Sequence, residues 1–228
     1  MIGIPQHLID RAVDAALAED VGLGDLTGTL TVEPDRRAKA AAVARSELVV
    51  AGLDVFRAAF LRFDPATVVQ PLAADGERAA RGTVLATVDG RARSVLAAER
   101  VALNFLQRLC GVATLTRRFV DAVPQGAKTR ILDTRKTTPG LRAFERYAVR
   151  CGGGVNHRSD LGGGVLIKDN HLAACGGSVG EAVRRALRGT GPTQRVEAEV
   201  TSLEQLDEAM AAGAHAVLLD NMTPERIA

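Results

Sequence analysis

Hydrophobic spacing in the first half of the chain alternates between helical and strand periods. Apolar positions recur at helical spacing over residues 5–19 and 53–61. Alternation and valine content predict strands within residues 39–50, 68–72 and 83–88. Gly22 and Gly24 end the first helix, and Asp25 and Thr27 are then expected to form a turn or helix cap. This order predicts an antiparallel sheet with one face covered by a helix.

A long helical pattern follows the predicted sheet. Ser94 is a plausible N-cap, and the apolar stripe that follows includes Leu96, Leu103, Leu106 and Leu109. Gly111 is expected to interrupt the helix, which resumes until Pro124 stops it.

After Pro124 short apolar strands alternate with helices, a pattern typical of a parallel α/β arrangement. The predicted strands are residues 130–134, 154–156, 165–167, 195–200 and 216–219. The predicted helices are residues 141–149, 179–187 and 203–211, the last capped by Thr201 or Ser202. Each strand carries or ends in polar residues, so in a barrel these side chains would gather at one mouth.

Composition and length indicate an ordinary globular protein. The 228 residues are 46% hydrophobic and 25% charged. No apolar run has the length that a membrane span needs, so no membrane partner is expected, and the first twenty residues do not resemble a signal peptide. The three cysteines, Cys110, Cys151 and Cys175, are far apart, which favours reduced thiols in the cytoplasm.

Positive charge is concentrated in residues 128–171, where nine Lys or Arg face four Asp or Glu, although the whole chain carries only +2. The basic residues are interleaved with glycines and predicted strand ends. A nucleic-acid arm usually presents them as a run on one helix or tail. With one Tyr, six Phe and no Trp, a stacking platform for single strands is also absent from the sequence. Nucleic acid is therefore not expected as a partner.

Four of these cations follow or flank short apolar runs, namely Arg135, Lys136, Arg158 and Lys168. Arginine presents a planar fork that suits carboxylates or phosphates, and lysine presents a point charge. Several such groups aimed into one pocket require an anion with more than one negative charge. A dicarboxylate, a phosphorylated sugar, or both would satisfy them.

Three carboxylates lie on the later strands. Glu197 and Glu199 point to the same side of their strand because side chains alternate with period two. Together with Asp220 on the next strand, they could bind Mg²⁺, which takes oxygen ligands and bridges to substrate phosphates. The alternative is that the same carboxylates pair with the lysines and arginines.

Several other features allow two interpretations. His157 stands between Asn156 and Arg158, where it could bind an anion or move a proton, or make a structural hydrogen bond. Arg100, beside the apolar stripe of the long helix, is on its own most simply a solvated partner of a nearby Glu. The glycine clusters 152–154 and 162–164 permit close backbone approach to a ligand but match no phosphate-binding fingerprint.

Longer motifs make the chain resemble the quinolinate phosphoribosyltransferase family, the decarboxylating nicotinate-nucleotide pyrophosphorylases of NAD biosynthesis. These motifs are D-T-R-K-T-T-P-G-L-R, G-G-G-V-N-H-R, L-I-K-D-N-H, V-E-A-E-V and L-L-D-N, with G-D-L-T and E-R-V-A-L-N-F-L-Q-R-L-C-G-V-A-T earlier. The resemblance spans residues 19–221. It implies an N-terminal α/β sandwich domain, expected here over residues 1–112, and a C-terminal open α/β barrel over residues 113–228.

The resemblance also implies a reaction: quinolinate and phosphoribosyl pyrophosphate give nicotinate mononucleotide, pyrophosphate and CO₂, with Mg²⁺. By the family pattern quinolinate would be held by Arg135, Arg158, His157 and Lys136, supported by Thr134. Lys136 and Lys168 would face the phosphates, while Glu197 and Asp220 would face the ribose hydroxyls and the metal. Lys136, Glu197 and Asp220 are therefore the expected catalytic residues. Arg100 would reach the neighbouring subunit's site in a homodimer.

The chain departs from the family pattern at its C-terminal end. The family continues with a Ser-Gly-Gly phosphate-binding turn and a Gly-Ala-Leu-Thr-His segment, and neither is present. An incomplete barrel is therefore expected. Two alternatives stay open: the related molybdenum-locus protein, whose substrate differs, and a non-catalytic, anion-binding truncated copy.

Overall fold

The computed structural model describes residues 3–227, and the chain divides into two compact units, Met1–His157 and Arg158–Ala228. The first unit contains α1 (Gln6–Val21), α2 (Leu26–Thr31), β1 (Arg37–Val43), β2 (Leu48–Val49), α3 (Leu53–Phe63), β3 (Val68–Pro71), β4 (Arg78–Ala79), β5 (Val84–Arg91), α4 (Ala92–Ala122) and α5 (Arg142–Cys151). The second contains β6 (Val165–Ile167), α6 (Asp169–Ala174), α7 (Val179–Gly189), β7 (Val196–Val200), α8 (Leu203–Ala211), β8 (Ala216–Leu219) and α9 (Pro224–Ile227).

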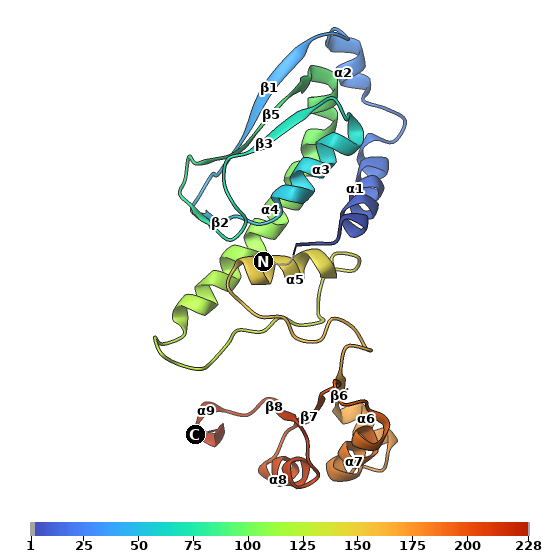
Figure 1. The fold of residues 1–228 in the computed structure, drawn as a ribbon, viewed down its shortest axis with the longest axis vertical. Coiled ribbons are helices and arrows are strands. Elements are labelled where there is room, and N and C mark those ends of the chain that lie inside the picture. Colours follow the sequence, from blue (N-terminus) through green and yellow to red (C-terminus); the bar gives the residue numbers. More distant parts are fainter. Residues whose placement is uncertain (1–2, 228) are drawn as a thin grey trace. The chain divides into compact units, whose positions relative to one another are not determined.

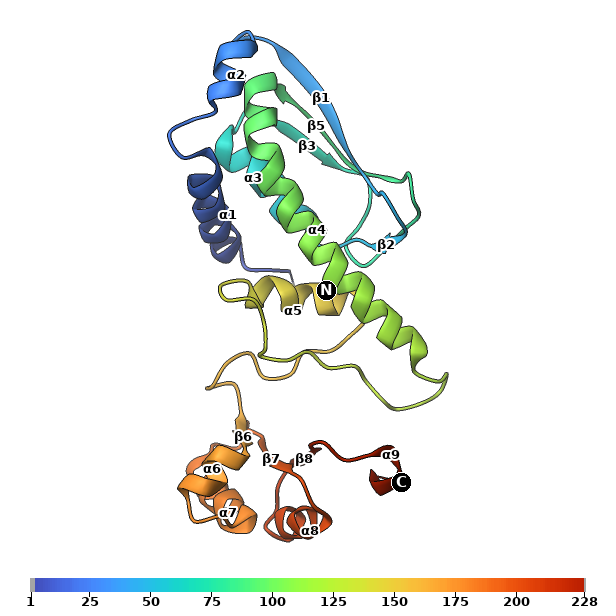
Figure 2. The same cartoon turned by 180° about the vertical axis from the view of Figure 1, so that it is seen from behind.

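The sheet of the first unit has the antiparallel order β1-β5-β3. Helices α3 and α4 lie against one face of this sheet, and α1 packs on these two helices (Figures 1 and 2). Buried side chains from all these layers, including Val13, Phe56, Val88 and Leu106, form one hydrophobic core. The predicted antiparallel sheet with a helix-covered face is confirmed.

Helix α4 runs without a break through residues 92–122 and ends before Pro124 as predicted, but two other predictions about its course are wrong. Ser94 is not the N-cap, because the helix begins earlier and the Ser94 hydroxyl donates instead to buried Asp64 at 2.7 Å. Gly111 does not interrupt the helix. The cost of a helical glycine, about 1 kcal/mol, is outweighed because buried residues on both sides of it, such as Leu109 and Ala113, pack against neighbouring elements.

The strands predicted at residues 130–134 and 154–156 are not formed. One isolated parallel bridge between Leu132 and Val155 is found in their place. The chain enters this bridge from the end of α5, where Gly152 packs so closely on α4 that an added Cβ would lie 2.5 Å from the backbone oxygen of Ala113. The backbone at Gly153 is left-handed, with φ +88°. Gly152 therefore serves close packing between α5 and α4.

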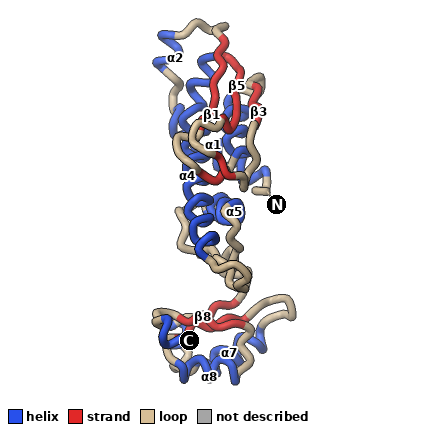
Figure 3. Tube along the Cα trace, turned by 90° about the vertical axis from the view of Figure 1, so that its left-hand side faces the viewer, coloured by secondary structure: helices blue, strands red, loops and turns tan. Residues whose placement is uncertain are grey.

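The second unit is a parallel sheet of order β6-β7-β8, with α7 and α8 on one face (Figure 3). Val196, Ala198 and Val200 of β7 are fully buried among the helix residues, so Glu197 and Glu199 project from the opposite face. The Ser202 side chain caps α8 by accepting from the Gln205 N–H, as predicted. Parallel strands alternating with helices confirm the predicted α/β class for this part.

Within residues 3–227, no helix combines the length and apolar character needed to cross a membrane. The three cysteines are free, as expected.

Candidate functional site

The first group of predicted site residues follows the Leu132 bridge. Thr134 and Lys136 line an open hollow of about 520 Å³, together with Asp133, Arg146 and apolar residues such as Phe119. Arg135 is half-buried, and its Nε is buried without a hydrogen-bond partner among the described residues. A buried N–H group left without a partner is costly, so this atom marks a position where a ligand's acceptor would be stabilised.

His157 is held through its backbone at the end of the same region. Its N–H donates to Asp133 Oδ1 at 2.7 Å, and its carbonyl accepts from Arg146 Nη2 at 2.7 Å. The Asp133 carboxylate, with its side chain only 4% exposed, also accepts from Asn156 Nδ2 at 2.6 Å. The structure therefore brings His157 close to the segment that precedes Thr134 and Arg135.

A second network holds the T-T-P-G loop that follows Lys136. Arg108 of α4 donates to Glu145 Oε1 at 3.0 and 2.6 Å and to Thr138 Oγ1 at 2.8 Å. The Thr138 N–H in turn donates to Glu145 Oε2 at 3.2 Å. Burial raises the pKa of Glu145, but hydrogen bonds from Thr138 and Arg108 outweigh it and leave the pKa below its ordinary value.

Sequence reasoning missed Arg108, Glu145 and Arg146 as supports of the site. One signal could have indicated part of this arrangement: α5 carries Arg142, Arg146 and Arg150 four residues apart, so they share one helix face beside the two motif segments.

In the second unit the predicted residues gather at the carboxyl ends of the parallel strands. Lys168 follows β6, and Asp220 follows β8, where its N–H donates to the Val200 carbonyl at 2.9 Å. Lys168 Nζ pairs with Glu199 at 2.6 Å. The alternative that a carboxylate pairs with a lysine is thus found for Glu199, while Glu197 lies two residues earlier on the same face.

Arg158 opens the second unit and is half-buried. Its Nη1 donates to the Gly164 carbonyl at 2.9 Å. This contact spans the loop that contains Gly162 and Gly163, so the arginine orders the turn that leads into β6.

Arg100 lies exposed on α4, and no described residue forms a hydrogen bond or ion pair with its side chain. The simple interpretation of Arg100 as the partner of a nearby Glu is therefore wrong within this chain. A long cation held on a rigid helix without an internal partner is available to another molecule.

Across residues 3–227, no three His, Cys, Asp or Glu side chains are grouped so that they could hold a metal ion by themselves. The pair Glu197 and Asp220 offers only oxygen donors, which suits Mg²⁺ when it shares further ligands with a substrate phosphate. These residues fit a metal that arrives with its substrate.

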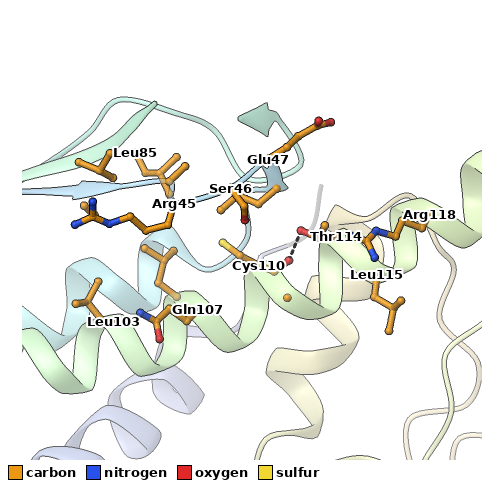
Figure 4. A pocket seen from close by; sticks show the side chains of 16 residues that line it. Arg45, Ser46, Glu47, Leu85, Leu103, Gln107, Cys110, Thr114, Leu115 and Arg118 are labelled. Carbon is orange, nitrogen blue, oxygen red and sulfur yellow. Dashed lines mark hydrogen bonds between the residues drawn. The ribbon is translucent and has the colours of Figure 1, made fainter. Parts of the chain in front are cut away.

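A second open hollow, of about 480 Å³, lies between α4 and the segment joining β1 to β2 (Figure 4). It contains none of the predicted site residues. Arg45 and Arg118 lie at opposite ends of it in Figure 4, and Cys110 is beneath it. Burial raises the pKa of the Cys110 thiol to about 11, so this thiol is not a ready nucleophile.

Comparison with known proteins covers nearly the whole chain. Residues 25–110 match the quinolinate phosphoribosyl transferase N-terminal domain, and residues 112–228 match its C-terminal domain. A Mycobacterium leprae relative, nicotinate-nucleotide pyrophosphorylase [carboxylating], is 47% identical over 90% of this chain and 72% of its own.

Solved structures agree. NadC from Streptococcus pyogenes is 42% identical with a TM-score of 0.93, covering 100% of this chain and 80% of that one. The nicotinate-nucleotide pyrophosphorylase from Francisella tularensis is 38% identical with a TM-score of 0.91, covering 99% and 78%. The expected fold, an N-terminal sheet domain followed by an α/β barrel-like part, is confirmed, and the chain belongs to the quinolinate phosphoribosyltransferase family.

Proposed function

We propose that the protein is a nicotinate-nucleotide pyrophosphorylase (carboxylating), a pentosyltransferase of NAD biosynthesis. It transfers the phosphoribosyl group of phosphoribosyl pyrophosphate to quinolinate and releases pyrophosphate and CO₂. The names and high identity of its relatives favour this function over a molybdenum-locus enzyme. Its three free cysteines are compatible with a cytoplasmic location.

One observation carries the assignment of the acid-binding residues. The buried Arg135 Nε lacks an acceptor among the described residues, and no described residue hydrogen-bonds to or pairs with the side-chain amine of neighbouring Lys136. We infer that these two adjacent cations bind an external anion. Following the family pattern, we assign the two carboxylates of quinolinate to Arg135, Lys136, His157 and Arg158, with Thr134 in support.

The second unit supplies groups for the sugar and phosphates. We assign Lys168 to the phosphates, and Glu197 and Asp220 to the ribose hydroxyls and Mg²⁺. When bound with the substrate, the metal neutralises charge on the leaving pyrophosphate. The carboxylates of Glu197 and Asp220 stabilise the positive character that develops at the anomeric carbon as the pyrophosphate bond breaks.

The cations of the first unit act mainly by orientation. By gripping both carboxylates, Arg135 and Lys136 direct the pyridine nitrogen toward the anomeric carbon, which lowers the entropic cost of the reaction. Attack forms the C–N bond and expels pyrophosphate. Loss of CO₂ leaves the electron pair of the broken C–C bond on the ring carbon, where the adjacent positively charged nitrogen stabilises it, and this carbon then takes up a proton.

Arg100 completes the proposal. We infer a homodimer in which Arg100 of one subunit reaches the quinolinate site of the other, because its exposed side chain has no partner among the described residues of its own chain. A cation contributed across the interface adds to the same anion-binding set.

Purified protein incubated with quinolinate, phosphoribosyl pyrophosphate and Mg²⁺ tests the function. We expect nicotinate mononucleotide and an equal amount of CO₂, both lost in Arg135→Gln and retained in the exposed control Arg188→Gln. A protein that binds a substrate in calorimetry but forms no product favours the non-catalytic, anion-binding alternative. A protein that binds neither substrate and forms no product refutes the assignment.

A further inference from the structure

Helix α5 presents a row of three arginines to the candidate site. Arg142, Arg146 and Arg150 are four residues apart and therefore lie one above another on the same helix face. Arg142 donates from Nε to the Thr137 hydroxyl at 3.1 Å, and Arg150 donates to the Asn156 side-chain oxygen. The row thus contacts both motif segments that carry predicted quinolinate-binding residues.

Arg146 is the central residue of this row. Its side chain is 12% exposed, and its Nη1 lies 3.1 to 3.2 Å from both oxygens of Asp133, whose side chain is 4% exposed. Its Nη2 donates to the His157 carbonyl at 2.7 Å. The planar guanidinium therefore fixes a carboxylate and a backbone carbonyl at once, which a lysine point charge cannot reproduce.

Asp133 completes the arrangement from the other side. It accepts from the His157 N–H at 2.7 Å, so both polar groups of the His157 peptide are held, one by each member of the ion pair. Asp133 also stands directly before Thr134 and Arg135. Its position couples the two motif segments, since any rotation of its carboxylate would move both.

A buried ion pair is a poor source of net stability, because desolvation offsets most of its attraction. Such a pair is better explained by the single geometry it imposes. Here that geometry sets the backbone of His157 relative to Arg135. Binding groups need to be held to within about 0.5 Å for full effect, and loops without regular strands, such as these, lack a ladder to provide that precision.

We propose that Arg146 and Asp133 are positioning residues, which orient His157 and the Thr134–Arg135 segment for quinolinate without contacting it. The proposal rests on the proposed function. It also gives α5 a role that its charge alone conceals, because a basic helix face beside an anion site suggests direct binding. The guanidinium of Arg146 instead donates hydrogen bonds to Asp133 and to the His157 carbonyl.

The test compares Arg146→Lys and Asp133→Asn with a stability control, Val13→Ala. This control opens a small cavity where fully buried Val13 of α1 packs into the hydrophobic core. Arg146→Lys keeps the charge but loses the fork. We expect its dissociation constant for quinolinate, measured by calorimetry, to rise about 10- to 100-fold, the range typical for loss of a residue that orients a ligand group. Val13→Ala should lower the melting temperature and leave quinolinate affinity unchanged.

A second readout does not depend on activity. The chain has four histidines, whose ring protons can be followed by NMR. We expect Arg146→Lys and Asp133→Asn to shift the His157 signal while those of His7 and His215 stay in place. If Asp133→Asn proves unfolded by circular dichroism, Arg146→Lys, which keeps the charge of the pair, decides.

The outcomes separate the two proposals. A folded Arg146→Lys protein with wild-type quinolinate affinity and an unmoved His157 signal overturns the positioning role. Failure of the wild-type protein to bind quinolinate overturns the proposed function instead, and the His157 signal still decides whether the pair orients that residue.

Discussion

Glu145→Gln is the most informative single change for the architecture that supports the site. It removes one negative charge from a side chain that is 9% exposed and leaves its shape almost unaltered. The carboxylate accepts from Arg108 Nε and Nη2 and from the Thr138 N–H. The amide can accept at one oxygen only, so one of these donors must face an NH₂ group.

The magnitude follows from the exposure of each partner. Hydrogen bonds to charged groups contribute about 1.5–3 kcal/mol, but the Arg108 side chain is 52% exposed and regains hydration when the charge is lost. We therefore expect a loss of roughly 1–2 kcal/mol, which corresponds to a melting temperature lower by about 2–8 °C for a unit of this size. The loop that follows Lys136 should loosen, which raises the KM for quinolinate more than it changes kcat.

The stability difference between wild type and Glu145→Gln should depend on pH in one direction. Because the pKa of Glu145 is lower in the folded protein, its charge stabilises the fold fully above the unfolded pKa, about 4.3, and the stabilisation is lost as the pH falls through the lower folded pKa. The free-energy gap between wild type and Glu145→Gln should be constant from pH 8 to 6 and narrow below pH 5.

Urea denaturation at several pH values measures the gap. The matched control is Glu181→Gln, since Glu181 forms an exposed i,i+4 pair with Arg185 on α7. It should change stability by no more than about 0.5 kcal/mol. Equal stabilities of wild type and Glu145→Gln at pH 7, or a gap unchanged at pH 4, would refute the reasoning.

Three further outcomes are expected. Mixing Arg100→Ala with Lys136→Ala protein should restore partial activity through hybrid dimers; absence of activity despite subunit exchange shown by mass spectrometry counts against the shared site. Gly152→Ala should lower stability by about 1–3 kcal/mol, because the added Cβ would lie 2.5 Å from a backbone oxygen of α4. Gly111→Ala, whose Cβ would meet open space, should instead stabilise α4 by about 0.5–1 kcal/mol. Thermal melting measures both changes. Asp64→Asn should lower stability by about 1–2 kcal/mol at pH 7. This difference in stability should shrink below pH 4, because hydrogen bonds from Arg91 and Ser94 lower the Asp64 pKa in the folded state. A difference that does not change with pH argues against that ion pair.

The regular elements were largely predictable because the spacing of apolar residues reflects which positions are buried. The helices α1, α3, α7 and α8 and the strands β5 to β8 fall where apolar spacing placed them, with ends displaced by a few residues. The misses have a common cause. Gly111 and Ser94 were interpreted by local propensity, but α4 is held by packing on several neighbours, and tertiary contacts override propensity.

The sequence yielded candidate site residues but not the residues that support them. Motif segments identified Arg135, Lys136, His157 and Lys168, because these residues stand where the apolar runs stop. Nothing local indicated that Arg108, thirty residues before Thr138 in the chain, hydrogen-bonds to the loop at Thr138, because long-range hydrogen bonds produce no periodic pattern in the sequence. The pairing of Lys168 with Glu199 was open for the same reason.

The distribution of paired charge changes the meaning of the basic segment. Counted along the sequence, residues 128–171 hold nine cations, which suggests a strongly positive surface. In the structure Arg146 is neutralised by Asp133 and Lys168 by Glu199, whereas the side chains of Arg135 and Lys136 have no protein acceptor among the described residues. Lys136 lines one hollow with Thr134, and a few fixed cations match a small, doubly charged acid better than an extended polyanion. The hydrogen-bonded arginines of α5 therefore favour a site selective for a small molecule. Such a site recognises its ligand by a few charged groups in fixed positions, whereas a polyanion is bound by many.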